Sequence, residues 1–199
     1  NVRDNSNVEE VINEIFKANK CIDVLINNAG GAPLISSLDA SMNFNNAIID
    51  VNLNSSFAVS YYGAKKMIKK SSGCVITNIS SVTATRPTPG SAAYGAAKGG
   101  LVNLTKTLAV EWAPRIRVNS IITGYIETEN SLVHYGSKKD MKAVAKTIPM
   151  KRMGTPEDIA NACIFLSSAN SSWITGTAIE VHGGGESPTY LNSAKPKKS

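Results

Sequence analysis

One tyrosine, one lysine and one serine in this sequence are spaced so that they could move a proton. Tyr94 and Lys98 lie in SAAYGAAKGG, and Ser81 precedes Tyr94 by thirteen residues, directly after the apolar run CVITNIS. A phenol has a pKa of about 10 and is a poor base at neutral pH, but a nearby ammonium favours the phenolate and lowers that pKa. Because Ser81 could donate a hydrogen bond to a substrate carbonyl oxygen, the three residues predict proton transfer at a carbonyl or hydroxyl group.

The Tyr-x-x-x-Lys spacing alone is a weak signal. The same spacing recurs at Tyr61/Lys65, Tyr62/Lys66 and Tyr135/Lys139. Thirteen residues before these tyrosines the sequence has Ile48, Ile49 and Ile122, none of which carries a hydroxyl. We therefore expect the three competing pairs to face solvent, and only Tyr94 and Lys98 to form a site.

The elements that must position these residues alternate between strand and helix. Short apolar runs predict strands at 23–27, 74–79, 116–122 and 177–181. Apolar residues at helical spacing predict a helix after a Ser6–Glu9 capping box, and others at 44–70 and 92–112. Thr155 as N-cap with Pro156 at the first helical position predicts one more helix.

This alternation predicts an α/β fold, with a Rossmann-like doubly wound parallel sheet and helices on both faces. Ligands in such sheets bind at the carboxyl ends of the strands. Asn28, Ser81, Thr123 and Gly124 each follow a predicted strand, so they are expected on one edge. The less regular segment 125–150 follows a strand end, where a lid over a substrate would lie.

Composition favours one globular domain at 1–185 and a tail at 186–199. The 199 residues are 42% hydrophobic and 18% charged. The net charge of +6 is scattered and partly in the tail, which argues against nucleic-acid binding. Three widely spaced cysteines predict buried free thiols, a reducing compartment and a cytoplasmic location. No run of the ~18 apolar residues of a membrane span occurs.

The sequence up to about Gly185 resembles the short-chain dehydrogenase/reductase family. The resemblance is carried by several motifs in order: NNAG at 27–30, VNLNSSF at 51–57, ITNISS at 76–81, YGAAK at 94–98, RVNS at 117–120, TGYIET at 123–128 and RMGTPEDIA at 152–160.

The resemblance implies a catalytic tetrad. Tyr94 would be the general acid/base, and Lys98 would lower the pKa of Tyr94 and hydrogen-bond the nicotinamide ribose. Ser81 would orient the substrate oxygen, and Asn52 would hold a water that relays protons.

It also implies NAD or NADP as cofactor. Asn27 to Gly30 would lie beside the adenosine half, with Asn27 tying neighbouring strands together. Gly124 and Thr128 would lie along the nicotinamide. The expected cofactor-binding residues are Asn27, Ala29, Gly30, Tyr94, Lys98, Gly124, Ile126 and Thr128, and no metal site is expected.

One family feature does not occur in the sequence. The family begins with a strand and a glycine-rich turn that receives the cofactor pyrophosphate, but no glycine precedes Gly30. N-terminal βα units are therefore expected to be absent. Two explanations are open: the chain is a fragment of a longer enzyme, or it is a shortened protein. We expect the fragment, because a shortened chain would expose an apolar edge strand.

Smaller differences concern single residues. Thr123 replaces the usual proline before Gly124, and His182 stands where the family carries an aspartate. His182 is expected to be structural, whereas His134 in the lid is a candidate for substrate contact.

The sequence thus predicts an NAD(P)-dependent oxidoreductase that interconverts a secondary alcohol and a ketone. Apolar residues in the lid suggest an apolar small-molecule substrate, such as a hydroxysteroid or a 3-oxoacyl thioester, unless they pack the lid itself. A redox-silent subunit that acts only in assembly is the alternative. A homodimer or homotetramer is expected, with neither nucleic acid nor membrane as a partner.

Overall fold

The fold is built on a parallel sheet that runs through the centre of the molecule. The structure, a computed structural model, describes residues 1–69, 73–186, 188, 189 and 193. Within these residues the sheet has the strand order β1-β2-β3-β4, and every neighbouring pair is parallel. The strands are β1 (Val24–Asn27), β2 (Cys74–Ser81), β3 (Ile116–Thr123) and β4 (Ala178–Val181).

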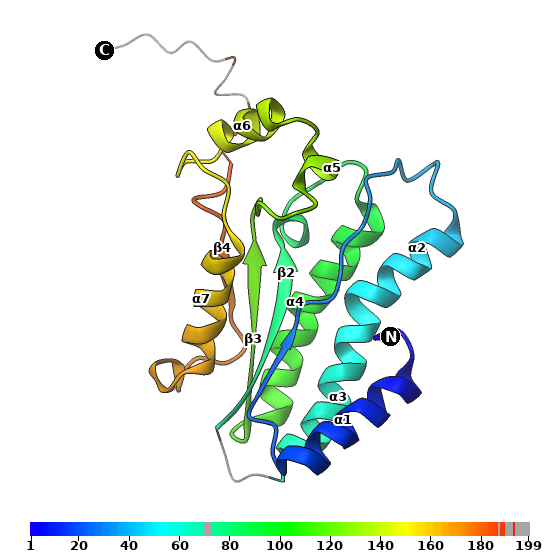
Figure 1. Cartoon of the computed structure of the whole chain (residues 1–199), viewed down its shortest axis with the longest axis vertical. Helices are drawn as coiled ribbons and strands as arrows, with labels where there is room; N and C mark the ends of the chain where they lie inside the picture. The colour runs from blue at the N-terminus through cyan, green and yellow to red at the C-terminus, as the bar shows by residue number, and fades with distance from the viewer. Residues whose placement is uncertain (70–72, 187, 190–192, 194–199) are drawn as a thin grey trace.

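Helices flank this sheet on two sides (Figure 1). On one side lie α1 (Asn5–Asn19), α3 (Ser55–Met67) and α4 (Ala92–Trp112), with α2 (Met42–Ile49) leading into α3, and α7 (Pro156–Ser167) lies on the other. The short helices α5 (Ser131–Tyr135) and α6 (Lys138–Thr147) lie beyond the carboxyl ends of the strands. The predicted Rossmann-like α/β fold is therefore confirmed.

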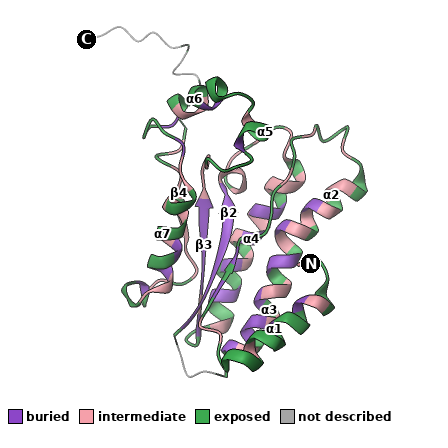
Figure 2. Cartoon of the chain, viewed as in Figure 1, coloured by how far each residue is buried: buried purple, intermediate pink, exposed green. Residues whose placement is uncertain are grey.

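The two central strands form the core, as their near-continuous apolar sequences predict. Every residue of β2 is buried, and the purple ribbons of β2 and β3 in Figure 2 show the same. One apolar cluster joins α1, α3 and α4 to the sheet, and includes Met67, Ile76 and Val118. A second cluster joins α7 to the opposite face, around Ile121 and Leu166.

Strand β1 is covered on one face only within the described residues. Leu25 and Asn27 are buried toward α3, whereas Val24 and Ile26 on the other face are 42% and 46% exposed. Helices on both faces, as predicted, thus hold for the centre of the sheet and not for β1.

The 44–70 helix is interrupted in a way that the sequence does not show. The chain is helical from α2 to α3, but Asp50–Asn54 between them form the π-helical segment η1. Single π turns within α-helices occur frequently at functional sites. This one contains Asn52, which is fully buried.

Two local predictions were wrong. Asp4, not Ser6, caps α1, because its carboxylate accepts from the backbone N–H groups of Ser6 and Asn7. Cys21 is exposed, whereas Cys74 and Cys163 are buried, and none of the three forms a disulfide. The predicted N-cap of α7 was correct: Thr155 forms a capping box with Asp158.

Among the described helices, none is both long and apolar enough to cross a membrane.

Candidate active site

Ser81 ends strand β2 and begins the short 3₁₀ turn η2 (Val82–Ala84). Its hydroxyl accepts a hydrogen bond from the backbone N–H of Thr83 at 3.3 Å, which caps this turn. The side chain is therefore fixed at the carboxyl edge of the sheet, where ligands of this fold class bind.

Tyr94 and Lys98 lie one turn apart near the start of α4, on the same side of the helix. The Lys98 Nζ lies 5.6 Å from the centre of the Tyr94 ring and donates to the Ile79 carbonyl at 2.8 Å. Tyr94 is also hydrogen-bonded to the Ser81 side chain. The predicted serine, tyrosine and lysine therefore meet in one place.

Burial dominates the electrostatics of this pair. Burial raises the pKa of Tyr94, and the hydrogen bond with Ser81 opposes part of that effect. Burial also lowers the pKa of Lys98 from 10.5 to about 8. The expected lowering of the Tyr94 pKa by Lys98 is thus not found in this structure, where the Lys98 Nζ donates its hydrogen bond to the carbonyl of Ile79.

Asn52 supports the same site from η1. Its Oδ1 accepts from the Gly31 N–H at 2.8 Å, and its Nδ2 donates to the carbonyls of Gly31 and Ile48, both at 2.9 Å. An added Cβ on Gly30 would lie 2.5 Å from Asn52 Oδ1 and 3.2 Å from Lys98 Nζ. The loop after β1, Asn52 and Lys98 are therefore in mutual contact, and only glycine fits at position 30.

Within the described residues the competing tyrosine–lysine pairs have no serine partner of this kind, and they do not all face solvent as expected: Tyr62, Lys66 and Tyr135 are half-buried. Tyr61 and Lys65 are both exposed on α3, with the Lys65 Nζ 4.2 Å above the Tyr61 ring. Lys66 lies over Phe16 of α1, and Lys139 is exposed on α6. Position beside a strand end, rather than spacing, distinguishes Tyr94 and Lys98.

A groove of about 1000 Å³ runs along the face of the sheet between β1 and α7. It contains Asn28, Ile126 and Thr128 at the carboxyl edge, with Val24 and Ile26 farther down β1. Apolar walls with the Asn28 amide and the Thr128 hydroxyl at the carboxyl edge suit a flat heteroaromatic ring that carries a carboxamide. The residues present therefore fit the nicotinamide part of a dinucleotide.

The predicted cofactor residues are divided between this groove and the interior. Ile126 and Thr128 line the groove, and Ala29 and Gly30 are exposed in the loop after β1. The Asn27 side chain instead points inward and donates to Asn78 Oδ1 at 2.7 Å, which ties β1 to β2 as expected.

Gly124 is required for packing. A Cβ there would lie 2.7 Å from the Cβ of His182 in the segment after β4. His182 contacts Glu180 at 2.9 Å through its Nε2, so its position fits the structural role expected of it.

The lid residues pack mainly on each other. Met141, Ile148 and Met153 form a small core with Tyr125, Tyr135 and Val144 around them. The expectation that lid side chains pack the lid itself thus accounts for most of them. His134 is exposed, with its ring 4.8 Å from that of Tyr135, and contact with a substrate stays a prediction.

Sequence reasoning missed Arg86, which lies five residues after Ser81 in the connection to α4. Its Nη2 donates to the Tyr125 hydroxyl at 2.9 Å and to Glu186 at 2.7 Å. Tyr125 stacks edge-to-face with Tyr135 at 6.0 Å, and Tyr135 is close enough to Tyr94 to be affected by its charge. Arg86 thus contacts Tyr125, whose ring packs on Tyr135 within electrostatic range of Tyr94. The signal available in the sequence was a lone cation in the loop that follows Ser81.

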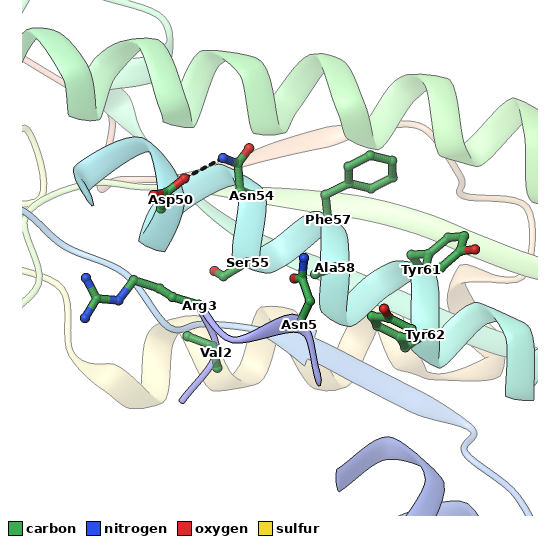
Figure 3. A pocket seen from close by; sticks show the side chains of 10 residues that line it. All are labelled: Val2, Arg3, Asn5, Asp50, Asn54, Ser55, Phe57, Ala58, Tyr61 and Tyr62. Atoms are coloured by element: carbon green, nitrogen blue, oxygen red, sulfur yellow. Dashed lines mark hydrogen bonds between the residues drawn. The ribbon is translucent and has the colours of Figure 1, made fainter. Parts of the chain in front are cut away.

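A separate hollow of about 550 Å³ lies between the N-terminal segment and α3 (Figure 3). Arg3, Asp50 and Asn54 lie around it, and Asn54 is hydrogen-bonded to Asp50 at 2.7 Å. It contains none of the four tetrad residues, so it is not a candidate for the reaction centre.

Known proteins of one family match almost the whole chain. A family model described as "Enoyl-(Acyl carrier protein) reductase" matches residues 1–186. The 3-oxoacyl-(acyl-carrier-protein) reductase FabG of Thermotoga maritima is 37% identical over 188 residues, covering 92% of this chain and 74% of the relative. The dehydrogenase/reductase SDR family member 4 of Pongo abelii is 35% identical over 178 residues, with 88% and 64% covered.

Solved structures agree with this assignment. The aldohexose dehydrogenase of Thermoplasma acidophilum superposes with a TM-score of 0.88 at 33% identity, covering 100% of this chain and 79% of that one. A gluconate 5-dehydrogenase from Burkholderia cenocepacia, solved with NADP and tartrate, gives 0.86 at 31% identity, covering 98% and 74%. Together with the meeting of Ser81, Tyr94 and Lys98, these matches show that the chain belongs to the short-chain dehydrogenase/reductase family of oxidoreductases.

Proposed function

We propose that this chain interconverts a secondary alcohol and a ketone with NAD or NADP, with Tyr94 as the general acid/base. The observation that carries the proposal is the contact of Tyr94 with both Ser81 and Lys98 at the carboxyl edge of the sheet. Two of the solved relatives named above are a gluconate and an aldohexose dehydrogenase, which supports a hydroxyl or carbonyl substrate.

Each residue has a separate task in the proposed reaction. Ser81 donates to the substrate oxygen and fixes it beside the Tyr94 hydroxyl, which gives or takes the proton. Lys98, with its pKa lowered to about 8 by burial, changes charge near neutral pH and can pass a proton. Asn52 holds the loop after β1 against Lys98, and the predicted water at Asn52 stays part of this proposal.

The cofactor would lie in the groove beside β1, held by Asn28, Ile126 and Thr128. When bound, it supplies the hydride that a carbonyl accepts. The gluconate 5-dehydrogenase was solved with NADP, which supports a nicotinamide cofactor here. The residues that line the groove are compatible with both NAD and NADP.

An apolar substrate has little support from the lid, because most of its apolar side chains pack among themselves. A homo-oligomer stays a prediction. Exposed Phe57 and Tyr61 on α3 and fully exposed Trp173 beyond α7 are surfaces that a second copy could cover.

Replacing Tyr94 with Phe tests the proposal. Oxidation of secondary alcohols and reduction of ketones by the purified chain should fall by at least about 100-fold, since general acid–base catalysis contributes about 10²–10⁴-fold. Tyr61→Phe, at a competing pair, is the matched control and should keep full activity. Substantial turnover by the Tyr94 variant would contradict the assignment. Calorimetric titration of the wild-type chain with NADH and NADPH tests the alternative of a redox-silent subunit, which predicts binding of neither.

A further inference from the structure

Arg86, Tyr125 and Glu186 form a cluster of polar side chains at the edge of the candidate active site. The Arg86 Nη2 reaches both the Tyr125 hydroxyl and the carboxylate of Glu186, at 2.9 and 2.7 Å. Burial and the neighbouring Glu186 carboxylate both raise the pKa of Tyr125. The guanidinium thus donates to a carboxylate with a phenol beside it, and both groups can serve as donors in an acid-binding site.

The surroundings leave room for another acid group. A cavity of about 290 Å³ lies here, and Arg86, Tyr125 and Glu186 are among its lining residues. The side chains of Arg86 and Glu186 are 31% and 34% exposed. A partly exposed ion pair of this kind contributes little net stability, so a carboxylate from a ligand can replace Glu186 at small cost.

The position relates this arrangement to catalysis. Arg86 follows Ser81 on the same connection, and the Tyr125 ring contacts Tyr135, which lies within electrostatic range of Tyr94. A molecule with its carbonyl at Tyr94 can therefore extend along the two tyrosine rings toward Arg86.

We propose that Arg86 and Tyr125 bind the carboxylate of an oxo-acid or hydroxy-acid substrate, and that Glu186 occupies this subsite in the substrate-free protein. The proposal rests on the proposed function, because it names the substrate class of the same site. Glu186 then acts as an internal competitor that leaves when an acidic substrate binds.

Binding measurements test the subsite without requiring turnover. The purified chain is titrated, by NMR chemical shifts, with 4-oxopentanoate and 5-oxohexanoate and with their methyl esters. The ester removes the charge and keeps the ketone, so the ratio of acid to ester affinity reports on the carboxylate alone. Wild-type protein should prefer at least one acid over its ester, and added salt should reduce that preference.

The variants give effects of opposite sign. Arg86→Met should reduce the acid-to-ester ratio by about 10- to 100-fold, as expected for loss of a charge-assisted hydrogen bond. Glu186→Gln should raise the ratio, because the competing charge is gone. Arg115→Met is the matched control: this arginine lies at the opposite end of β3, where it donates to Ile68 at 2.9 Å, and the ratio should not change.

Three results would overturn the subsite: equal binding of acids and esters by the wild-type chain, no binding of either acid, or a ratio that Arg86→Met leaves unchanged. A purely structural latch would instead make Arg86→Met and Glu186→Gln change the ratio in the same direction. Tyr94→Phe should keep the acid preference. Acid preference without any turnover would therefore reject the proposed reaction and retain the subsite.

Discussion

Lys98 should make the stability of this protein increase with pH between about 8 and 10.5. The side chain is only 4% exposed, and burial lowers its pKa from 10.5 to about 8. The folded protein therefore releases this proton near pH 8, whereas the unfolded chain keeps it until about pH 10.5. Because the unfolded state binds more protons in that range, raising the pH favours the folded state.

The size of the effect follows from the two pKa values. The difference between 10.5 and about 8 corresponds to about 3 kcal/mol, at about 1.4 kcal/mol for each tenfold change in the equilibrium. Lys98→Met removes the titrating group. The unfolding free energy of the wild type minus that of the variant should therefore rise by about 3 kcal/mol from pH 7 to pH 10.5.

Urea unfolding at a series of pH values measures this difference. Both proteins should also be compared in a Tyr94→Phe background, since Tyr94 is the adjacent titrating group and would otherwise contribute at high pH. Lys106→Met removes an exposed lysine from the same helix and is the matched control. A difference that stays flat or falls as the pH rises would refute the claim that burial destabilises the Lys98 ammonium.

Two further predictions concern the loop after β1. Gly30→Ala should destabilise the protein by about 1–3 kcal/mol in urea unfolding and reduce turnover, because its Cβ would lie 2.5 Å from Asn52 Oδ1. Gly99→Ala on α4, where the nearest atom would be 3.6 Å away, should be neutral or slightly stabilising. Asn52→Ala should cost about 2–3 kcal/mol and speed hydrogen exchange at the Gly31 amide, which loses its 2.8 Å acceptor. Asn54 lies on the exposed side of η1, so Asn54→Ala should neither lower the stability by this amount nor speed exchange at the Gly31 amide.

The order of elements could be predicted because their signals are local. Strands β2 and β3 are buried along nearly their whole length, so apolar residues occur consecutively in both, as at Val75-Ile76 and Ile121-Ile122. Helix α7 begins where a threonine cap and a following proline indicate. The start of α1 was misplaced because Asp4 and Ser6 are both good caps, and the sequence alone does not show which side chain meets the free N–H groups.

Asn52 could be named only from the family resemblance. The meeting of Ser81 with Tyr94 and Lys98 could be predicted, because Ser81 ends strand β2 and the other two lie one turn apart near the start of α4. The Arg86 contacts could not, because Arg86 and Glu186 are 100 positions apart and meet only when β2 and β4 end at the same edge. The direction in which the pKa of Tyr94 shifts could also not be predicted from the sequence. It depends on burial of the phenol and on the Lys98 Nζ being bonded to Ile79, and neither is encoded by the Tyr-x-x-x-Lys spacing.

The π turn at η1 explains how Asn52 and Gly30 determine the surroundings of Lys98. A π turn is wider than an α turn, and at this point the Asn52 side chain meets both its own helix, at Ile48, and the loop at Gly31. That loop in turn brings Gly30 against Lys98. A change at Gly30 or Asn52 must therefore move Lys98 or expose it to water, and exposure would return its pKa toward 10.5. If so, Asn52→Ala should also weaken the pH dependence that Lys98 gives to stability, whereas Asn54→Ala should leave it intact.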